Sequence, residues 1–337
     1  LLMHTSIFFL SPIGMKTLEN KMENPEALAP LKQIVQVSTP CERKIISIWT
    51  NPIYESQLTP LPSRANIECL LQALSAPFFL LKVLDVGYLK HLLRLYCDFR
   101  DGLIPEPYFS YSDYLLMNSS LLVACLVIEE FSEKALNGGG PMPDFKSLRE
   151  VSDNLLDNAL FYYSRLSVIS GGVSSIVGSL FLAFYADSIS LSRAAYLISS
   201  SAIRQAQELG LHIEETYRTL PQHERALRLN IWWACYVFDR ELCIRWGQTP
   251  VINDNDISAP PLPGFEAYWS PNQTAEQGPS KRSIYHFEIQ TLLEPLLENP
   301  SSSIDLEQYI STDYAFITAK VYDNFLRAGA LKNVIKK

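Results

Sequence analysis

The chain has 337 residues, of which 47% are apolar and 19% are charged, so it can bury a large core and is not intrinsically disordered. It carries 28 Lys and Arg against 36 Asp and Glu, a formal net charge of -8, so its average surface repels phosphate. These numbers disfavour a stand-alone nucleic-acid-binding domain and allow one large or two ordinary domains.

The six cysteines are widely spaced along the sequence. The shortest step between two of them is the eight residues from Cys235 to Cys243, so no C-x2-C pair is present. This spacing excludes a local zinc knuckle, finger or binuclear cluster within this sequence, and we predict no cofactor or metal for the chain itself. Cysteines inside apolar runs are typical of small buried side chains in a reduced, intracellular compartment.

The first 62 residues are rich in proline and show weak periodicity, which predicts an irregular arm or linker with short helical pieces. The opening run LLMHTSIFFL is too short to span a bilayer, so no membrane association is expected. The chain begins with Leu1, and 324–337 has a helical pattern that runs to the last residue. Both features favour a fragment or a truncated gene product.

From residue 63 onward, apolar residues recur at helical spacing in successive segments, and no strand alternation is visible. We therefore predict an all-α, multi-helix bundle-like domain over 63–337. The expected helices are 63–101 in two pieces, 114–136, 147–170, 176–186, 190–209, 222–246, 281–298 and 303–335, with a mobile loop over 264–280.

Two helix boundaries carry specific signals. Gly210 stands where a left-handed residue would end the helix over 190–209, and Leu211 can fold back onto its last turn. Thr219 is the expected N-cap of the next helix, with Pro221 in the first turn.

No motif for catalysis or phosphate binding is present: the sequence lacks G-x-S-x-G, Walker A, G-x-G-x-x-G and H-E-x-x-H. Two histidines stand beside acidic residues, His212 near Glu214 and His223 beside Glu224. A metal site is one interpretation of these pairs, but we prefer histidines in a loop and at a helix end.

Asp239 and Arg240 end an otherwise apolar stretch, and burying either charge alone would cost several kcal/mol. One interpretation is an internal ion-pair network that joins them to Arg204 and to the loop aspartates Asp254 and Asp256. The alternative is the polar floor of a ligand pocket, with walls formed by the aromatic side chains Trp232, Trp233, Tyr236 and Phe238. Both interpretations use the same residues, and we favour the network.

The runs AIRQAQELGLH (202–212) and ERALRLNIWWACYVFDRELCIRWGQTPVINDNDISAPPLP (224–263) resemble the regulatory domain of fungal zinc-cluster transcription factors, the fungal-specific transcription factor domain or middle homology region. The resemblance covers about 61–330 and is most specific over 200–263. Gln248 stands where the family pattern has an arginine, which removes one partner for the loop aspartates. The matching positions are Arg204, Gly210, Leu211, His212, Arg228, Trp232, Trp233, Asp239, Arg240, Gly247, Asp254, Asp256 and Pro263, and we take them as structural or effector-pocket candidates.

The resemblance implies a helical regulatory module of a nuclear protein that controls RNA polymerase II transcription. DNA binding would reside in an N-terminal six-cysteine zinc cluster, which this sequence lacks, so zinc would enter only with an upstream cluster. The implied partners are DNA through that segment, a second copy in a homodimer, co-regulator proteins and a small-molecule effector.

Two other functions compete with this one. The chain could be an interaction protein without a cluster that titrates a zinc-cluster partner. Alternatively, it could be a helical enzyme with His212, Asp239 or Glu241 as acid-base groups, although we expect no enzymatic activity.

Overall fold

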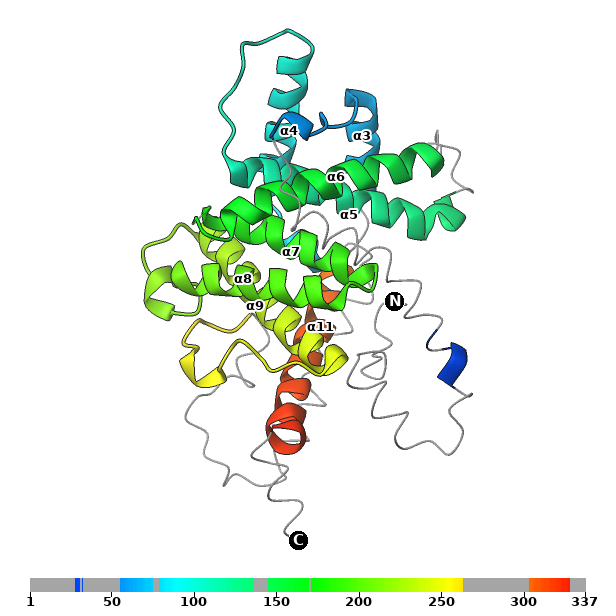
Figure 1. Cartoon of the computed structure of the whole chain (residues 1–337). Helices are drawn as coiled ribbons and strands as arrows, with labels where there is room; N and C mark the ends of the chain where they lie inside the picture. The colour runs from blue at the N-terminus through cyan, green and yellow to red at the C-terminus, as the bar shows by residue number, and fades with distance from the viewer. Residues whose placement is uncertain are drawn as a thin grey trace.

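The computed structural model describes residues 28–30, 32, 55–74, 79–135, 145–169, 171–262 and 303–327, and within these ranges it is built from helices without strands (Figure 1). This confirms the all-α prediction. The α-helices are α3 (Arg64–Ala73), α4 (Val86–Arg100), α5 (Tyr111–Ala135), α6 (Phe145–Leu166), α7 (Gly172–Ser188), α8 (Ser192–Glu208), α9 (Gln222–Trp246) and α11 (Ser303–Val321). Short turns are η3 (Glu55–Gln57), η4 (Phe79–Val83), η5 (Glu214–Tyr217), η6 (Asp254–Asp256) and the π-helical turn η8 (Tyr322–Leu326).

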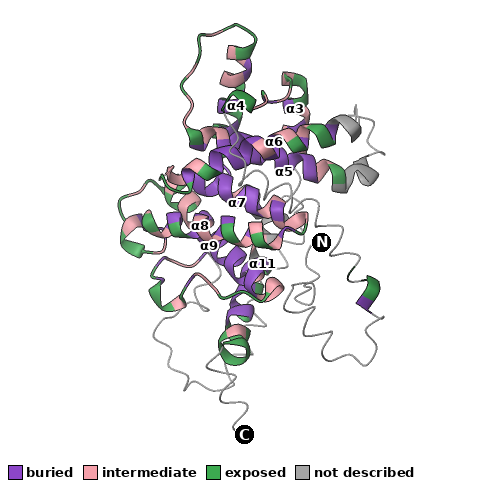
Figure 2. Ribbon diagram, in the orientation of Figure 1, coloured by how far each residue is buried: buried purple, intermediate pink, exposed green. Residues whose placement is uncertain are grey.

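The helices pack in a sequence that largely follows the chain. α5 contacts α6 and α7, α7 contacts α8, α8 contacts α9, and α9 contacts α11 (Figure 1). α7 lies in the centre, and ten of its seventeen residues are buried. Figure 2 shows the same pattern, with buried residues concentrated where α5, α6 and α7 meet. A helix that is apolar on all sides needs neighbours on all sides, and the order of packing supplies them.

The close approach of α5 and α7 depends on Gly178. A Cβ atom at Gly178 would lie 2.9 Å from Cγ of Leu115 and 3.1 Å from the backbone nitrogen of Leu116. The first 19 residues of α5, Tyr111–Glu129, are long and apolar enough to cross a membrane, with a mean hydropathy of 1.4. However, 72% of that window is buried inside the protein, as expected for a core helix of this packing.

The predicted helix boundaries agree with the structure to within about four residues in most places, and α9 has the predicted bounds. The predicted start of α8 at Ser190 is wrong. Ser190 adopts a left-handed conformation with φ of 63° and closes α7, because the N–H of Leu191 bonds back to the Ala186 carbonyl at 2.8 Å. Glycine is the usual residue in this position, so the sequence carries no signal for the break.

The predicted N-cap at Thr219 is also wrong. α9 begins at Gln222 with Pro221 as its N-cap, and Pro221 has an extended ψ of 151° and no side-chain cap. The Pro221 carbonyl accepts the first helical bond from Arg225 at 2.9 Å. Proline therefore stands just outside the helix rather than in its first turn.

Residues 58–62 of the predicted arm lie against the helical body. The side chain of Asn158 on α6 accepts from the Thr59 N–H at 3.2 Å and donates to the Thr59 carbonyl at 2.8 Å. On α4, the Tyr96 hydroxyl accepts from the Leu61 N–H, and Arg100 donates to the Leu61 carbonyl. The predicted helix over 303–335 is wrong in its extent, because α11 ends at Val321, η8 ends at Leu326 and Arg327 is extended with ψ of 135°. The predicted loop over 264–280 and the predicted helix over 281–298 lie outside the described residues, and the domain boundary at 62/63 stays a prediction.

Gly178→Ala tests the contact between α5 and α7. Alanine favours a helix by about 1 kcal/mol over glycine, but overpacking a tight core contact costs about 1–3 kcal/mol. We expect the contact to dominate and the free energy of unfolding to fall by about 1–2 kcal/mol in urea titration.

The matched control is Gly87→Ala, on the exposed side of α4. There the new Cβ meets only a carboxylate oxygen of Asp85, at 3.2 Å, which can shift. This variant should be as stable as the unaltered chain or more so. Equal behaviour of the two variants would contradict the close approach at Gly178.

Candidate regulatory site

The signature block, residues 200–262, contains the end of α8, η5, α9 and the loop that follows α9. α8 ends in a left-handed glycine: Gly210 has φ of 72°, and the N–H of Leu211 bonds to the Ala206 carbonyl at 3.0 Å. This confirms the predicted stop. A side chain at Gly210 would also meet Cγ2 of Thr216 at 2.7 Å, so the turn requires glycine for both its conformation and its space.

His212 connects this turn to the distant loop through its backbone. Its carbonyl accepts from the N–H groups of Ser258 and Ala259, both at 2.9 Å. Its ring is half-buried and lies 5.7 Å from the ring of Trp232. Within the described residues, no group of three or more His, Cys, Asp or Glu is arranged to hold a metal ion.

The four aromatic side chains in the middle of α9 are buried but face different neighbours. Trp232 faces His212, whereas Phe238 packs edge-on against Phe184 of α7. Trp233 and Tyr236 both contact Phe316 of α11, and the indole N–H of Trp233 bonds to the Pro260 carbonyl at 2.9 Å. Successive helical residues diverge by about 100°, so these rings join α9 to several partners and do not share one pocket.

A small cavity adjoins Trp233 between α9, η4 and α11. Its volume is about 10 Å³, and Val83, Ala234 and Thr312 are among its lining residues. That is enough space for about one water molecule.

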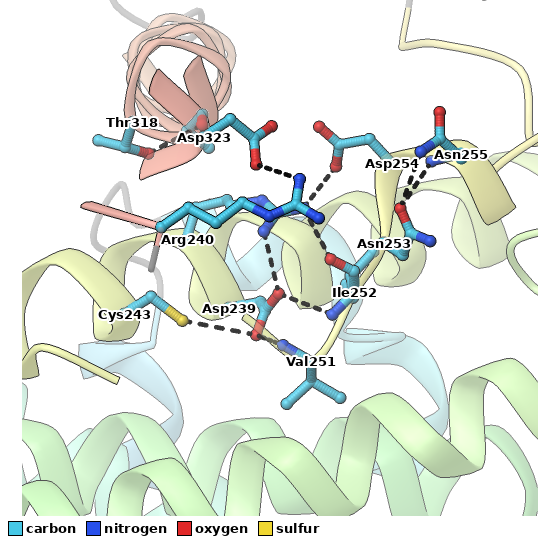
Figure 3. A network of polar contacts seen from close by, with 12 residues as sticks. Asp239, Arg240, Cys243, Val251, Ile252, Asn253, Asp254, Asn255, Thr318 and Asp323 are labelled. Carbon is cyan, nitrogen blue, oxygen red and sulfur yellow. Dashed lines mark hydrogen bonds and ion pairs between the residues drawn. The ribbon is translucent and has the colours of Figure 1, made fainter. Parts of the chain in front are cut away.

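Asp239 and Arg240 lie buried at the centre of a polar network between α9 and the loop (Figure 3). The Asp239 carboxylate accepts from the N–H groups of Val251 at 2.8 Å and Ile252 at 3.0 Å. The Arg240 guanidinium lies 3.7 Å from Asp239, donates to the Ile252 carbonyl at 2.9 Å and pairs with Asp254. Both charges therefore act on the same short stretch of loop backbone.

Two further features complete this arrangement. Arg240 lies over the Tyr236 ring, 4.8 Å from its centroid, at a distance suited to a cation–π interaction. Gly247 ends α9 with φ of 65°, and this left-handed turn starts the return of the loop toward Asp239. On the other side of the network lie Thr318 and Asp323, from α11 and η8 (Figure 3).

The remaining candidate residues lie outside this network. The predicted ion pairing of Arg204 with the aspartates is wrong: Arg204 is exposed on α8 and donates to Gln207 at 2.8 Å. Asp256 is exposed in the loop, so its predicted place in the network is also wrong. Arg228 pairs with Glu224 one turn earlier on α9, at 2.7 Å. Pro263 lies outside the described residues.

The structure contains a second polar cluster that no sequence pattern predicts. Asp187, at the end of α7, pairs with Arg245 and accepts from the indole N–H of Trp246 at 3.0 Å. Glu241 lies 3.6 Å from Arg245, one turn earlier on α9. These residues join the ends of α7 and α9, which are more than 50 residues apart in sequence. The one sequence signal for the contact is a charged residue at the end of each apolar helix.

Burial controls the electrostatics of the block. Burial raises the pKa of Asp239, while Arg240 and the N–H groups of Val251 and Ile252 act to lower it. Burial also raises the pKa of the Cys235 and Cys243 thiols, and Asp239 adds to that rise, so both stay protonated. Burial lowers the pKa of His212 from its ordinary value of 6.5, and Asp256 partly opposes this.

Comparison with known proteins places this arrangement in a family. The model of the family described as "Fungal specific transcription factor domain" matches residues 108–326, about two thirds of the chain. The match includes the signature block and the helices that pack around it. The chain therefore belongs to the fungal specific transcription factor domain family.

Several curated proteins are similar to parts of the chain. Transcription factor TAC1 of Candida albicans is 38% identical over 168 residues, which cover 44% of this chain and 17% of that protein. Halotolerance protein 9 of Saccharomyces cerevisiae is 24% identical over 258 residues, covering 72% of this chain and 24% of that protein. An ABC-transporter-regulating transcription factor of Aspergillus oryzae is 24% identical over 103 residues, covering 31% of this chain and 12% of that protein.

These alignments cover a quarter or less of each of the three relatives. No solved structure matches the chain.

Asp239→Asn tests the buried pair. An amide would leave Arg240 without its neighbouring charge and would place an N–H₂ group among loop N–H donors. We expect the free energy of unfolding to fall by about 3–5 kcal/mol, measured by urea titration. Asp256→Asn, an exposed acid in the same loop, should change it by no more than about 0.5 kcal/mol. Equal stability of the two variants would show that the buried pair does not stabilise the fold.

The His212 imidazole gives a pH dependence. Burial lowers the pKa of His212, so the folded chain binds a proton on this ring less readily than the unfolded chain does. The free energy of unfolding therefore falls as the pH falls below 6.5, the ordinary pKa of the imidazole in the unfolded chain. His212→Gln should therefore lose less stability than the unaltered chain between about pH 7.5 and about pH 5.5, measured by denaturant titration at each pH. The control is His223→Gln, at the exposed start of α9. The hypothesis fails if His212→Gln shows the full loss.

Proposed function

We propose that the chain is the regulatory module of a fungal transcription factor that acts in the nucleus on RNA polymerase II transcription. The observation that carries this proposal is the family match over 108–326, which spans α5 to η8 and includes the signature block. In this proposal DNA binding belongs to a zinc cluster outside this sequence, and the module influences transcription through contacts with co-regulator proteins or with other parts of the factor.

The cysteines that the structure describes do not favour a zinc site. Cys97, Cys125, Cys235 and Cys243 are buried free thiols, and the sequence has no C-x2-C pair to bring two thiolates to one metal. In this proposal, zinc would enter only with an upstream cluster. The net charge of -8 agrees with a module that does not itself bind phosphate.

The contacts of the signature block support a regulatory surface. The loop after α9 is held at one point by the His212 carbonyl and at another by Asp239 and Arg240. Between these two points Asn253, Asn255 and Asp256 are exposed. A loop with a fixed backbone and outward polar side chains can bind a protein partner with little loss of conformational entropy.

The contacts also bear on the proposed acid-base residues. Asp239 accepts two backbone N–H groups, Glu241 lies next to Arg245, and the His212 ring packs on Trp232. These structural contacts support regulation over catalysis. A small-molecule effector would have to displace the packed aromatic rings of α9 or bind elsewhere.

A reporter assay tests the proposal. Fused to a heterologous DNA-binding domain in a fungal host, the chain should raise or lower reporter output relative to that domain alone. Asp254→Asn, which weakens the hold of Arg240 on the loop, should shift the output by several-fold, whereas Asp256→Asn should not. Immunoblots would confirm equal protein levels.

Reporter output equal to that of the DNA-binding domain alone would contradict a regulatory module. An unfused chain that instead lowers the output of a full-length zinc-cluster factor would favour the competing interaction protein without a cluster.

A further inference from the structure

α11 has two opposite apolar faces, and the helical body covers only one of them. The buried face packs against α9 and η4 and contains six residues, Ser311, Thr312, Ala315, Phe316, Thr318 and Ala319. The other face carries Ile310, Tyr314, Ile317 and Val321, which are 57%, 40%, 52% and 38% exposed. At about 100° per residue these four side chains fall within a sector of about 60°, roughly opposite the buried face. We call them the α11 stripe.

The spacing of the stripe is that of a coiled-coil seam. Its members are four, three and four residues apart, which matches alternating a and d positions of a heptad. Isolated exposed apolar residues are ordinary, but a contiguous stripe on one helix marks an interaction surface. The end of α11 extends beyond the other described helices (Figure 1), so a partner helix can lie alongside it.

The flank of the stripe identifies the partner. Asp313 and Lys320 lie on the same side of the stripe, one heptad apart, both in the g position. Within the described part of the chain, neither side chain forms an ion pair. A partner helix should therefore present a cation opposite Asp313 and an anion opposite Lys320.

A second copy of α11 in antiparallel orientation meets both requirements. When Tyr314 lies opposite Ile317 of the second copy, Ile310 lies opposite Val321. In that register the g positions face each other, so Asp313 of each copy lies opposite Lys320 of the other. The arrangement is isologous, as a two-fold dimer requires.

We propose that the α11 stripe is a self-association surface on which a second copy of this chain docks its own α11 antiparallel. The proposal does not depend on the transcriptional role. The stripe spans eleven helical steps, or about 16 Å, and is smaller than the roughly 800 Å² per partner of a standard stable interface. The dimer is accordingly weak and forms at micromolar or higher concentration.

Sedimentation equilibrium of the full chain over a range of concentrations tests the surface. The average mass should rise toward that of a dimer, and Ile317→Glu should abolish the rise. Leu103→Glu, which alters an exposed apolar residue in the loop between α4 and α5, is the control and should dimerise normally. Unchanged melting temperatures would show that both variants are folded.

Charge exchange tests the register. Asp313→Lys alone, or Lys320→Asp alone, places like charges opposite each other at two symmetric points and should weaken dimerisation about tenfold. The double exchange Asp313→Lys with Lys320→Asp should restore it. An equimolar mixture of the two single variants should also dimerise, because each then presents the charges that the other lacks.

Three outcomes would overturn the proposal. A chain that stays monomeric at all concentrations means that the stripe is covered by another part of the protein or by a different partner. Association that survives Ile317→Glu lies on another surface. Association that is lost in this variant but not restored by charge exchange has a different register. None of these mass measurements bears on the reporter result, so the two proposals can fail separately.

Discussion

The buried pair of Asp239 and Arg240 controls the path of the chain after α9. Two adjacent charges on an apolar helix must find partners, and at 3.7 Å they do not satisfy each other. The backbone of residues 251 and 252 supplies the remaining bonds, two N–H groups for Asp239 and a carbonyl for Arg240. The loop must therefore turn back at once, and a left-handed Gly247 makes this turn sterically feasible.

The same constraint connects helices that are distant in sequence. The returning loop brings Pro260 to the Trp233 indole and Ser258 to the His212 carbonyl, so it closes over the end of α8. α9 is then covered by α8 on one side and by α11 on the other, which explains why its middle is apolar on all sides. α11 needs only one face for this contact, and its second apolar face remains exposed.

Much of the candidate site could be predicted from single residues with strong local rules. Glycine in a left-handed turn, an apolar helix in a bundle and the need of buried charges for partners all led to correct statements about Gly210, α9 and Asp239. The choice of partners could not be predicted in the same way. Arg204 was expected in the network and lies exposed, whereas the contact between Asp187 and Arg245 was not expected at all. An ion pair between residues more than 50 positions apart depends on which helix ends lie next to each other, and no local sequence pattern predicts that.

The sequence by itself determined the class of the fold, most helix positions and the family, because periodicity, caps and the motif over 200–263 are local properties. Only the tertiary structure decided which residues share a network, that Ser190 separates α7 from α8, and which face of α11 is left uncovered. Each of these depends on close contacts between helices, such as the one at Gly178 that brings α5 against α7. The physical reason is that a helix pattern shows which face is apolar but not which neighbour will bury it.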